Sequence, residues 1–201
     1  LPLHAMTTSE LDALNAVAGP LGLAVEVGTR GIATDHLLTY LRLAEQLRAP
    51  LVRVVVDTAE HHPGPPEVVD ALSKIMPEFE RAGVWLAIEN HDRFSARVLA
   101  DIIRAVGSPR LGVCLDTVNS FGALEGPEVV LEALWALTVN VHVKDFAVAR
   151  AGHQMGFVIE GRPAGEGQLN VPWLLQRLRK LGRAPNLILE LWTPPEATLA
   201  E

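Results

Sequence analysis

The chain has 201 residues, 49% of them apolar, and 17 Lys and Arg against 24 Asp and Glu leave a net charge of −7. This composition excludes a disordered chain, and the acidic balance argues against nucleic acid or an anionic membrane as the main partner. No apolar run reaches the ~18 residues of a membrane span, and the single cysteine, Cys114, excludes an internal disulfide. We therefore expect a protein of a reducing compartment, the cytoplasm.

Short aliphatic runs alternate along the chain with segments of helical apolar spacing. The runs predict strands at 21–28, 51–57, 84–89, 111–116, 138–144 and 187–192. The intervening segments predict helices at 9–17, 36–47, 68–81, 96–106, 129–137 and 172–181. The first five strands start at intervals of roughly 30 residues, the length of a βα unit. Aliphatic strands alternating with helices indicate a parallel sheet covered by helices.

Alternate positions in the predicted strands differ in chemistry. One set is aliphatic in every strand, as with Val52 and Val54, whereas the other set mixes small, aromatic and charged residues, as with Arg53. In a doubly wound sheet both faces meet helices, so both sets would be aliphatic. In a (β/α)8 barrel only the outer set meets helices, and the inner set turns polar toward the active-site end. The pattern predicts a TIM barrel.

The number of strands bears on whether the barrel is complete. A full barrel needs eight strands and about 250 residues, whereas this chain shows six predicted strands and begins without Met. We expect one barrel domain over residues 1–201 that lacks the first β-α-β units. The strands at 21–28 and 187–192 would then each lack one neighbour.

Four potential metal ligands share the inward parity at the ends of the last four strands: Glu89, Asp116, His142 and Glu190. Three carboxylates that converge without a counter-charge would force protons onto some of them. A divalent cation removes that cost, and an imidazole suits the fourth position. Three oxygens and one nitrogen favour Mn, Mg or Co, with Zn as a further option. A lone acidic residue after a strand usually caps a helix, but four matched positions favour a single metal site.

Several motifs resemble those of the xylose-isomerase-like TIM barrels: 88–91 (IENH), 114–119 (CLDTVN), 141–145 (VHVKD), 165–167 (GEG) and 189–190 (LE). This superfamily contains sugar isomerases and epimerases, inosose dehydratases and apurinic endonucleases. The resemblance implies one metal, held by Glu89, Asp116, His142 and Glu190. The endonuclease branch uses three metals and a histidine-rich site, which this acidic chain does not match.

Three neighbouring residues are predicted to contact substrate. His91 lies two residues beyond Glu89, Lys144 shares the inward parity of His142, and Glu166 lies in the glycine-rich turn. Each also has a structural interpretation. His91 could be a loop residue, Lys144 could form an ion pair with Asp145 or Glu190, and Glu166 could be an ordinary turn residue.

The predicted function is a divalent-metal-dependent isomerase or epimerase of a sugar or polyol-derived hydroxy-ketone. Glu89 and Glu190 would act as the catalytic acid and base, through proton abstraction and a metal-bound enediolate. Two alternatives remain: an inosose-type dehydratase with the same metal site, and a catalytically idle metal-binding barrel. The expected partner is a small carbohydrate, with neither nucleic acid nor membrane, and the sequence leaves a homo-oligomer open.

Overall fold

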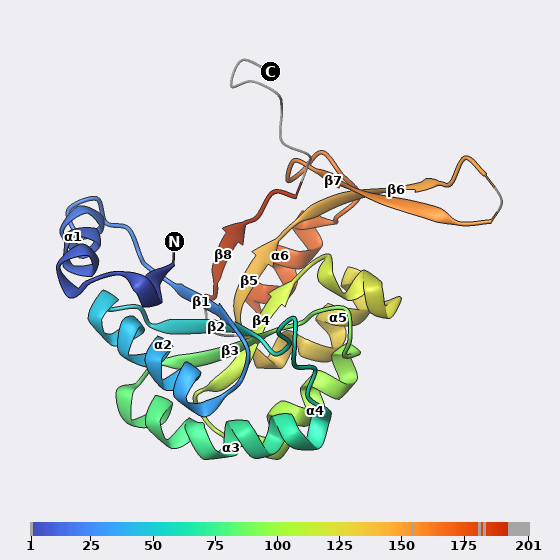
Figure 1. The fold of residues 1–201 in the computed structure, drawn as a ribbon. Helices are drawn as coiled ribbons and strands as arrows, with labels where there is room; N and C mark the ends of the chain where they lie inside the picture. The colour runs from blue at the N-terminus through green and yellow to red at the C-terminus, as the bar shows by residue number, and fades with distance from the viewer. Residues whose placement is uncertain (1, 154, 181, 183, 193–201) are drawn as a thin grey trace. The chain divides into compact units, whose positions relative to one another are not determined.

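A computed structural model of the chain describes residues 2–153, 155–180, 182 and 184–192. It contains two compact units, Leu1–Glu89 with Arg97–Cys114 and Asn90–Ala96 with Leu115–Glu201. Within the described residues, six strands form one sheet in the order β1-β2-β3-β4-β5-β8, and β6 and β7 form a separate two-stranded sheet (Figure 1). No helix in this described part of the chain has the length and apolarity to cross a membrane.

The first unit alternates strands and helices. Its strands are β1 (Val27–Arg30), β2 (Leu51–Val55), β3 (Trp85–Glu89) and the start of β4 (Leu111–Asp116), and the strands pair in parallel. Its helices are α1 (Thr8–Ala18), α2 (Thr34–Leu47), α3 (Pro65–Ala82) and most of α4 (Ala96–Val106), after a 3-10 turn η1 (Leu3–Ala5). Helices α2 and α3 lie side by side against β1–β3 (Figure 1).

Local sequence explains the limits of α3. Pro65 lies at its start, where a missing N–H costs nothing, and Gly83 ends it with a φ of 71°. Its buried residues have the spacing of one helix face, i, i+4, i+7, i+8 and i+11: Val68, Leu72, Ile75, Met76 and Phe79. This stripe packs into the core of the first unit, and the predicted helix at 68–81 lies within the observed one.

The second unit contains the remaining elements. They are the 3-10 turn η2 (Asn119–Ala123), α5 (Pro127–Leu134), the 3-10 turn η3 (Trp135–Leu137), β5 (Thr138–Val143), β6 (Asp145–Arg150), β7 (Phe157–Arg162), α6 (Val171–Arg179) and β8 (Asn186–Leu189). Strands β5 and β8 pair in parallel. The Asn170 side chain caps α6 by accepting a hydrogen bond from the Trp173 N–H. Leu181, at the end of the predicted helix 172–181, lies outside the described residues.

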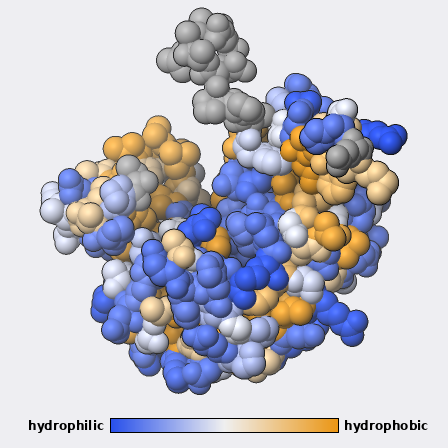
Figure 2. All heavy atoms as spheres, turned by 45° about the vertical axis from the view of Figure 1, so that its right-hand side comes forward, coloured by the Kyte–Doolittle hydropathy of each residue, from blue (hydrophilic) through white to orange (hydrophobic). Residues whose placement is uncertain are grey.

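Two strand predictions need correction. The strand predicted at 21–28 is shorter and begins at Val27. Residues 19–22 form a turn, in which Gly22 has a φ of 65°, and the pairing of β1 with β2 starts only at Val27, after four residues without regular structure. Apolar side chains around this turn are exposed, including Leu21 and Leu23, and Figure 2 shows apolar surface over the N-terminal segment. The other correction is an antiparallel pair, β6 and β7, between two predicted parallel strands. These two strands project as a long ribbon (Figure 1).

The predicted aliphatic set is buried in the middle strands and exposed at one end of the sheet. Val54, Leu86 and Val113 are fully buried, whereas Leu187 and Leu189 of β8 are 44% and 69% exposed. Strands β1 and β8 are the end strands of the described sheet, each paired with one neighbour. The strand order and intervening helices are those of the predicted TIM-barrel class, with six strands in the described residues.

Candidate metal centre

Three of the four predicted ligands meet in the second unit. Asp116 ends β4, His142 lies in β5, and Glu190 follows β8. One potential ligand atom of each residue lies within 4.8 Å of the others. His142 Nδ1 is 3.0 Å from Glu190 Oε2 and 3.9 Å from Asp116 Oδ2. The three side chains therefore converge because the carboxyl ends of neighbouring parallel strands share one edge of the sheet.

The Asp116 carboxylate is fixed by its own loop. Oδ1 accepts hydrogen bonds from the N–H groups of Val118 and Asn119, at 2.8 and 2.9 Å. The Asn90 side chain holds the Asp116 backbone, accepting from its N–H at 2.7 Å and donating to its carbonyl at 2.9 Å. Because Oδ1 is occupied, Oδ2 is the oxygen that faces His142 and Glu190.

Thr117 joins the ends of β4 and β5. Its N–H donates to the His142 carbonyl at 3.2 Å, and its hydroxyl donates to the Lys144 carbonyl at 2.7 Å. The Lys144 N–H donates back to the same hydroxyl at 2.9 Å. Thr117 is 3% exposed, so these bonds are sheltered from water. They fix the backbone from the His142 carbonyl to the Lys144 carbonyl.

Lys144 is the cation of this cluster. Its ammonium lies 2.9 Å from Asp116 Oδ2 and 3.1 Å from Glu190 Oε2, and it donates to Asn119 Oδ1 at 3.2 Å. Burial lowers the pKa of Lys144, but the Asp116 and Glu190 carboxylates raise it more, so its pKa lies above the ordinary value. The lysine therefore stays charged between the two acids.

The donor atoms of this cluster fit a divalent cation. Asp116 Oδ2, His142 Nδ1 and Glu190 Oε2 are all buried from solvent and face one another. Two carboxylate oxygens and an imidazole nitrogen suit Mg, Mn or Zn better than a soft, thiolate-binding metal. The Asp116 and Glu190 carboxylates also carry one negative charge more than Lys144 neutralises, which favours an added cation.

Glu89, the remaining predicted ligand, lies in the first unit at the end of β3. It is 6% exposed, and its Oε2 lies 3.2 Å from Nε of Arg53 on β2. The Arg53 guanidinium fits here because Gly28 has no side chain: a Cβ at that position would lie only 2.8 Å from it. In the sheet register Glu89 pairs with Cys114, two residues before Asp116 on the same strand. The register therefore leaves Glu89 at a strand end, as the sequence predicted.

The predicted substrate contacts differ in their surroundings. Lys144 and Asn119 line a hollow of about 240 Å³, together with Asp92, Phe121, Ile159 and Trp192 among others. His91 Nδ1 lies 3.1 Å from Asp92 Oδ1, beside this hollow. Glu166 is exposed in its turn, where its N–H donates to the Pro163 carbonyl.

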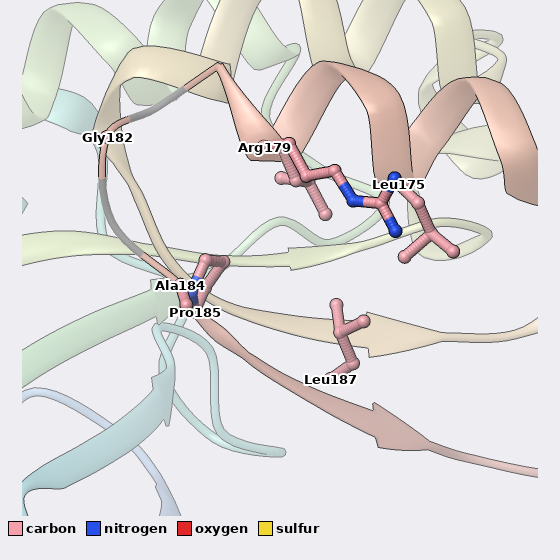
Figure 3. Close-up of a pocket in the computed structure, with 7 residues that line it drawn as sticks. Leu175, Arg179, Gly182, Ala184, Pro185 and Leu187 are labelled. Carbon is pink, nitrogen blue, oxygen red and sulfur yellow. The ribbon is translucent and has the colours of Figure 1, made fainter.

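A larger hollow of about 510 Å³ lies elsewhere in the second unit, between α6 and β8 (Figure 3). It is lined by Leu175, Leu178 and Leu187 together with Arg179, Gly182, Ala184 and Pro185. Among these described residues none is a carboxylate or an imidazole, so this larger hollow lacks the kinds of ligand that Asp116, His142 and Glu190 provide.

Asp145 is a buried anchor that the sequence did not identify. Its carboxylate accepts hydrogen bonds from four backbone N–H groups, those of Phe146, Gly165, Gly167 and Leu169, at 2.8–3.0 Å. Burial raises the pKa of Asp145, but these four bonds lower it more, so its pKa lies below the ordinary value. The anchor fixes the glycine-rich turn that carries Glu166.

Known proteins resemble this chain in sequence and in fold. A relative described as 3-oxo-isoapionate decarboxylase, from Pectobacterium atrosepticum, is 38% identical over 199 residues, which cover 99% of this chain and 72% of that protein. D-psicose 3-epimerase from Clostridium cellulolyticum, crystallised with D-tagatose, superposes with a TM-score of 0.77 at 14% identity, over 98% of this chain and 74% of that one.

A second solved structure and a family model lead to the same group of proteins. A xylose isomerase-like TIM barrel protein from Mycobacterium smegmatis, in complex with magnesium, superposes with a TM-score of 0.75 at 14% identity, over 96% of this chain and 75% of that one. The family model described as "Xylose isomerase-like TIM barrel" matches residues 11–201. The chain therefore belongs to the xylose isomerase-like TIM barrel family.

Proposed function

We propose that the chain is a divalent-metal-dependent enzyme that removes CO2 from a sugar-derived 3-oxo acid. The observation that carries this proposal is the relative that is 38% identical across 99% of the chain, whose described reaction is the decarboxylation of a 3-oxo acid. Loss of CO2 from such an acid leaves an electron pair conjugated with the ketone, which is an enolate. The cluster of Asp116, His142, Glu190 and Lys144 supplies the charges that this chemistry needs.

Asp116, His142 and Glu190 would hold the metal, and the sequence-based prediction adds Glu89 as the fourth ligand. When bound, a divalent metal polarises the substrate carbonyl and stabilises the negative charge that develops on its oxygen. Asp116 is fixed by backbone N–H groups and acts as a ligand. The Glu190 side chain is 43% exposed, so it can reach both this cluster and a substrate. We assign to Glu190 the relay of a proton: its carboxylate takes a proton from water and passes it to the enolate carbon.

An isomerase or epimerase is the second candidate. It would form a related enolate by removing a proton from carbon instead of CO2, and Glu89 and Glu190 would act as the two catalytic carboxylates. The observation in its favour is that both carboxylates lie at strand ends, Glu89 at the end of β3 and Glu190 after β8. A dehydratase would begin with the same proton abstraction and then expel a hydroxyl group.

The test measures products with the full chain loaded with Mn²⁺. CO2 release from a 3-oxo sugar acid, with no deuterium uptake by a panel of ketoses in heavy water, supports the decarboxylase. Deuterium uptake with recovery of an epimer or isomer supports the second candidate, and a product lighter by one water indicates the dehydratase. Tight Mn²⁺ binding without turnover would leave an idle metal-binding barrel and overturn both proposals.

A matched pair of variants tests the assigned base. Glu190→Gln keeps the size of the side chain and one oxygen ligand but cannot transfer the proton. Turnover should fall by the ~10²–10⁴-fold that general acid–base catalysis contributes, at matched Mn²⁺ occupancy. Glu128→Gln, on the exposed start of α5, should leave turnover unchanged. Near-normal turnover in Glu190→Gln would reduce Glu190 to a metal ligand.

A further inference from the structure

Lys144 uses the same oxygen atoms that a metal would need. Its ammonium contacts Asp116 Oδ2 and Glu190 Oε2, and these oxygens also face His142 Nδ1. Asp116 Oδ1 already accepts two backbone hydrogen bonds, so it cannot replace Oδ2 as the ligand without breaking them. A metal cation bound by Asp116 and Glu190 would therefore compete with the Lys144 ammonium for the same two carboxylate oxygens.

The Lys144 ammonium has an alternative position beside Asn119. Its ammonium already donates to Asn119 Oδ1 at 3.2 Å, and both residues line the hollow of about 240 Å³. The four-carbon stem of lysine is flexible, so the ammonium can turn while its backbone stays fixed by Thr117. Asp92 also lines the hollow, but its carboxylate lies 3.1 Å from His91 Nδ1 and so has a partner of its own.

The walls of the hollow suit a small, partly polar molecule. Trp192 donates its ring N–H to the Asp145 carbonyl at 2.9 Å, which fixes the indole at the edge of the hollow. Phe121 and Ile159 add apolar surface, with Ile159 contributed by the β6–β7 ribbon. Phe121 packs edge-on against Phe146, with ring centroids 4.8 Å apart. Within this apolar frame Lys144 is the cation that an anionic group would meet.

We propose that Lys144 is a specificity residue that metal binding releases: a divalent cation takes its carboxylate partners, and the freed ammonium binds the carboxylate of the substrate in the adjacent hollow. This inference rests on the proposed function, since it takes the substrate to be a sugar acid. It makes metal binding and carboxylate binding mutually dependent. By thermodynamic linkage, each ligand must then raise the affinity for the other by the same factor.

The test is calorimetric and does not use turnover. Mn²⁺ is titrated into the full chain, and D-gluconate is compared with D-sorbitol, which has the same carbon chain but no carboxylate. Lys144→Gln should bind Mn²⁺ at least ~10-fold more tightly, because no ammonium has to be displaced, and should lose the preference for gluconate over sorbitol. Lys180→Gln removes the same charge from the exposed end of α6 and should change neither quantity.

The unmodified chain provides a second measurement that does not depend on a variant folding. Its affinity for Mn²⁺ should be ~5-fold or more higher with saturating gluconate than with sorbitol. Equal Mn²⁺ affinity in the two solutions, or an unchanged gluconate preference in Lys144→Gln, would overturn the role of Lys144. Linked binding without CO2 release would instead overturn the proposed reaction and leave this inference standing.

Discussion

Replacing Asp145 by Asn should destabilise the chain far more than a surface change of the same kind. The Asp145 carboxylate is 1% exposed and accepts four backbone N–H groups. An Asn side chain offers one oxygen and one NH2 group, so two of these N–H groups would face a donor. Hydrogen bonds to a charged group contribute about 1.5–3 kcal/mol each, so the loss of two costs roughly 3–6 kcal/mol.

Thermal unfolding followed by circular dichroism measures this effect. For a chain of this length each kcal/mol shifts Tm by about 2–4 °C, so Asp145→Asn should lower Tm by at least ~6 °C. Asp101→Asn is the control, because exposed Asp101 pairs with Arg104 at 3.2 Å and such surface pairs contribute about 0.2–1 kcal/mol. Equal Tm losses in the two variants would refute the anchoring role of Asp145.

The pH dependence of stability gives an independent check on Asp145. Its pKa is lowered in the folded chain, so the ionised carboxylate favours folding. This stabilisation is complete above the ordinary aspartate pKa of about 3.9 and is lost as the pH falls below that value. Between pH 5 and about pH 3, the unfolding free energy of Asp145→Asn should therefore change less than that of the unmodified chain.

Three further predictions concern the site and the turn beside it. Gly167→Ala should cost about 1–3 kcal/mol in thermal unfolding, because its Cβ would lie 2.2 Å from Asp145 Oδ1, whereas Gly152→Ala, with open space around it, should cost far less. Asn90→Ala should lower the unfolding free energy in urea by roughly 2–6 kcal/mol, because the buried N–H and carbonyl of Asp116 both lose their side-chain partner. His142→Ala should weaken Mn²⁺ binding by more than the ~10–100-fold that is lost with a residue that only hydrogen-bonds to a metal ligand. Excess Mn²⁺ should partly restore turnover. Unchanged Mn²⁺ affinity would remove His142 from the ligand set.

The alternation of aliphatic and polar positions was enough to predict the sheet. Each buried strand packs one set of alternate residues against helices, so this set must be aliphatic. The pattern can be read from each strand's own sequence. The same rule misjudged the start of β1 at Val27, because the turn at Gly22 depends on backbone conformation and not on apolar content. The β6–β7 ribbon has its own hydrogen bonds and many exposed residues, so no buried aliphatic run marks it.

The sequence predicted candidate ligands more readily than the groups that position them. Asp116, His142 and Glu190 could be identified because each lies at the end of a recognisable strand. Asn90 and Thr117 act on groups 26 and 27 residues away, so their roles depend on how neighbouring strands meet. No local spacing encodes such pairs. The charged partners of Lys144 were likewise open in the sequence, which offered Asp145 and Glu190 but not Asp116.

The contrast between Asp145 and Lys144 shows how adjacent residues divide two tasks at the end of β5. The Asp145 carboxylate accepts hydrogen bonds from backbone N–H groups, which stay in place as long as the turn is folded, so its negative charge stabilises that turn. The Lys144 ammonium contacts two side-chain carboxylates and an amide oxygen, and each of these groups can bind a different cation or hydrogen-bond donor in its place. A charge held by backbone is committed to the fold, whereas a charge held by exchangeable side chains can be redirected. This difference in partners is why we place the stability test on Asp145 and the binding test on Lys144.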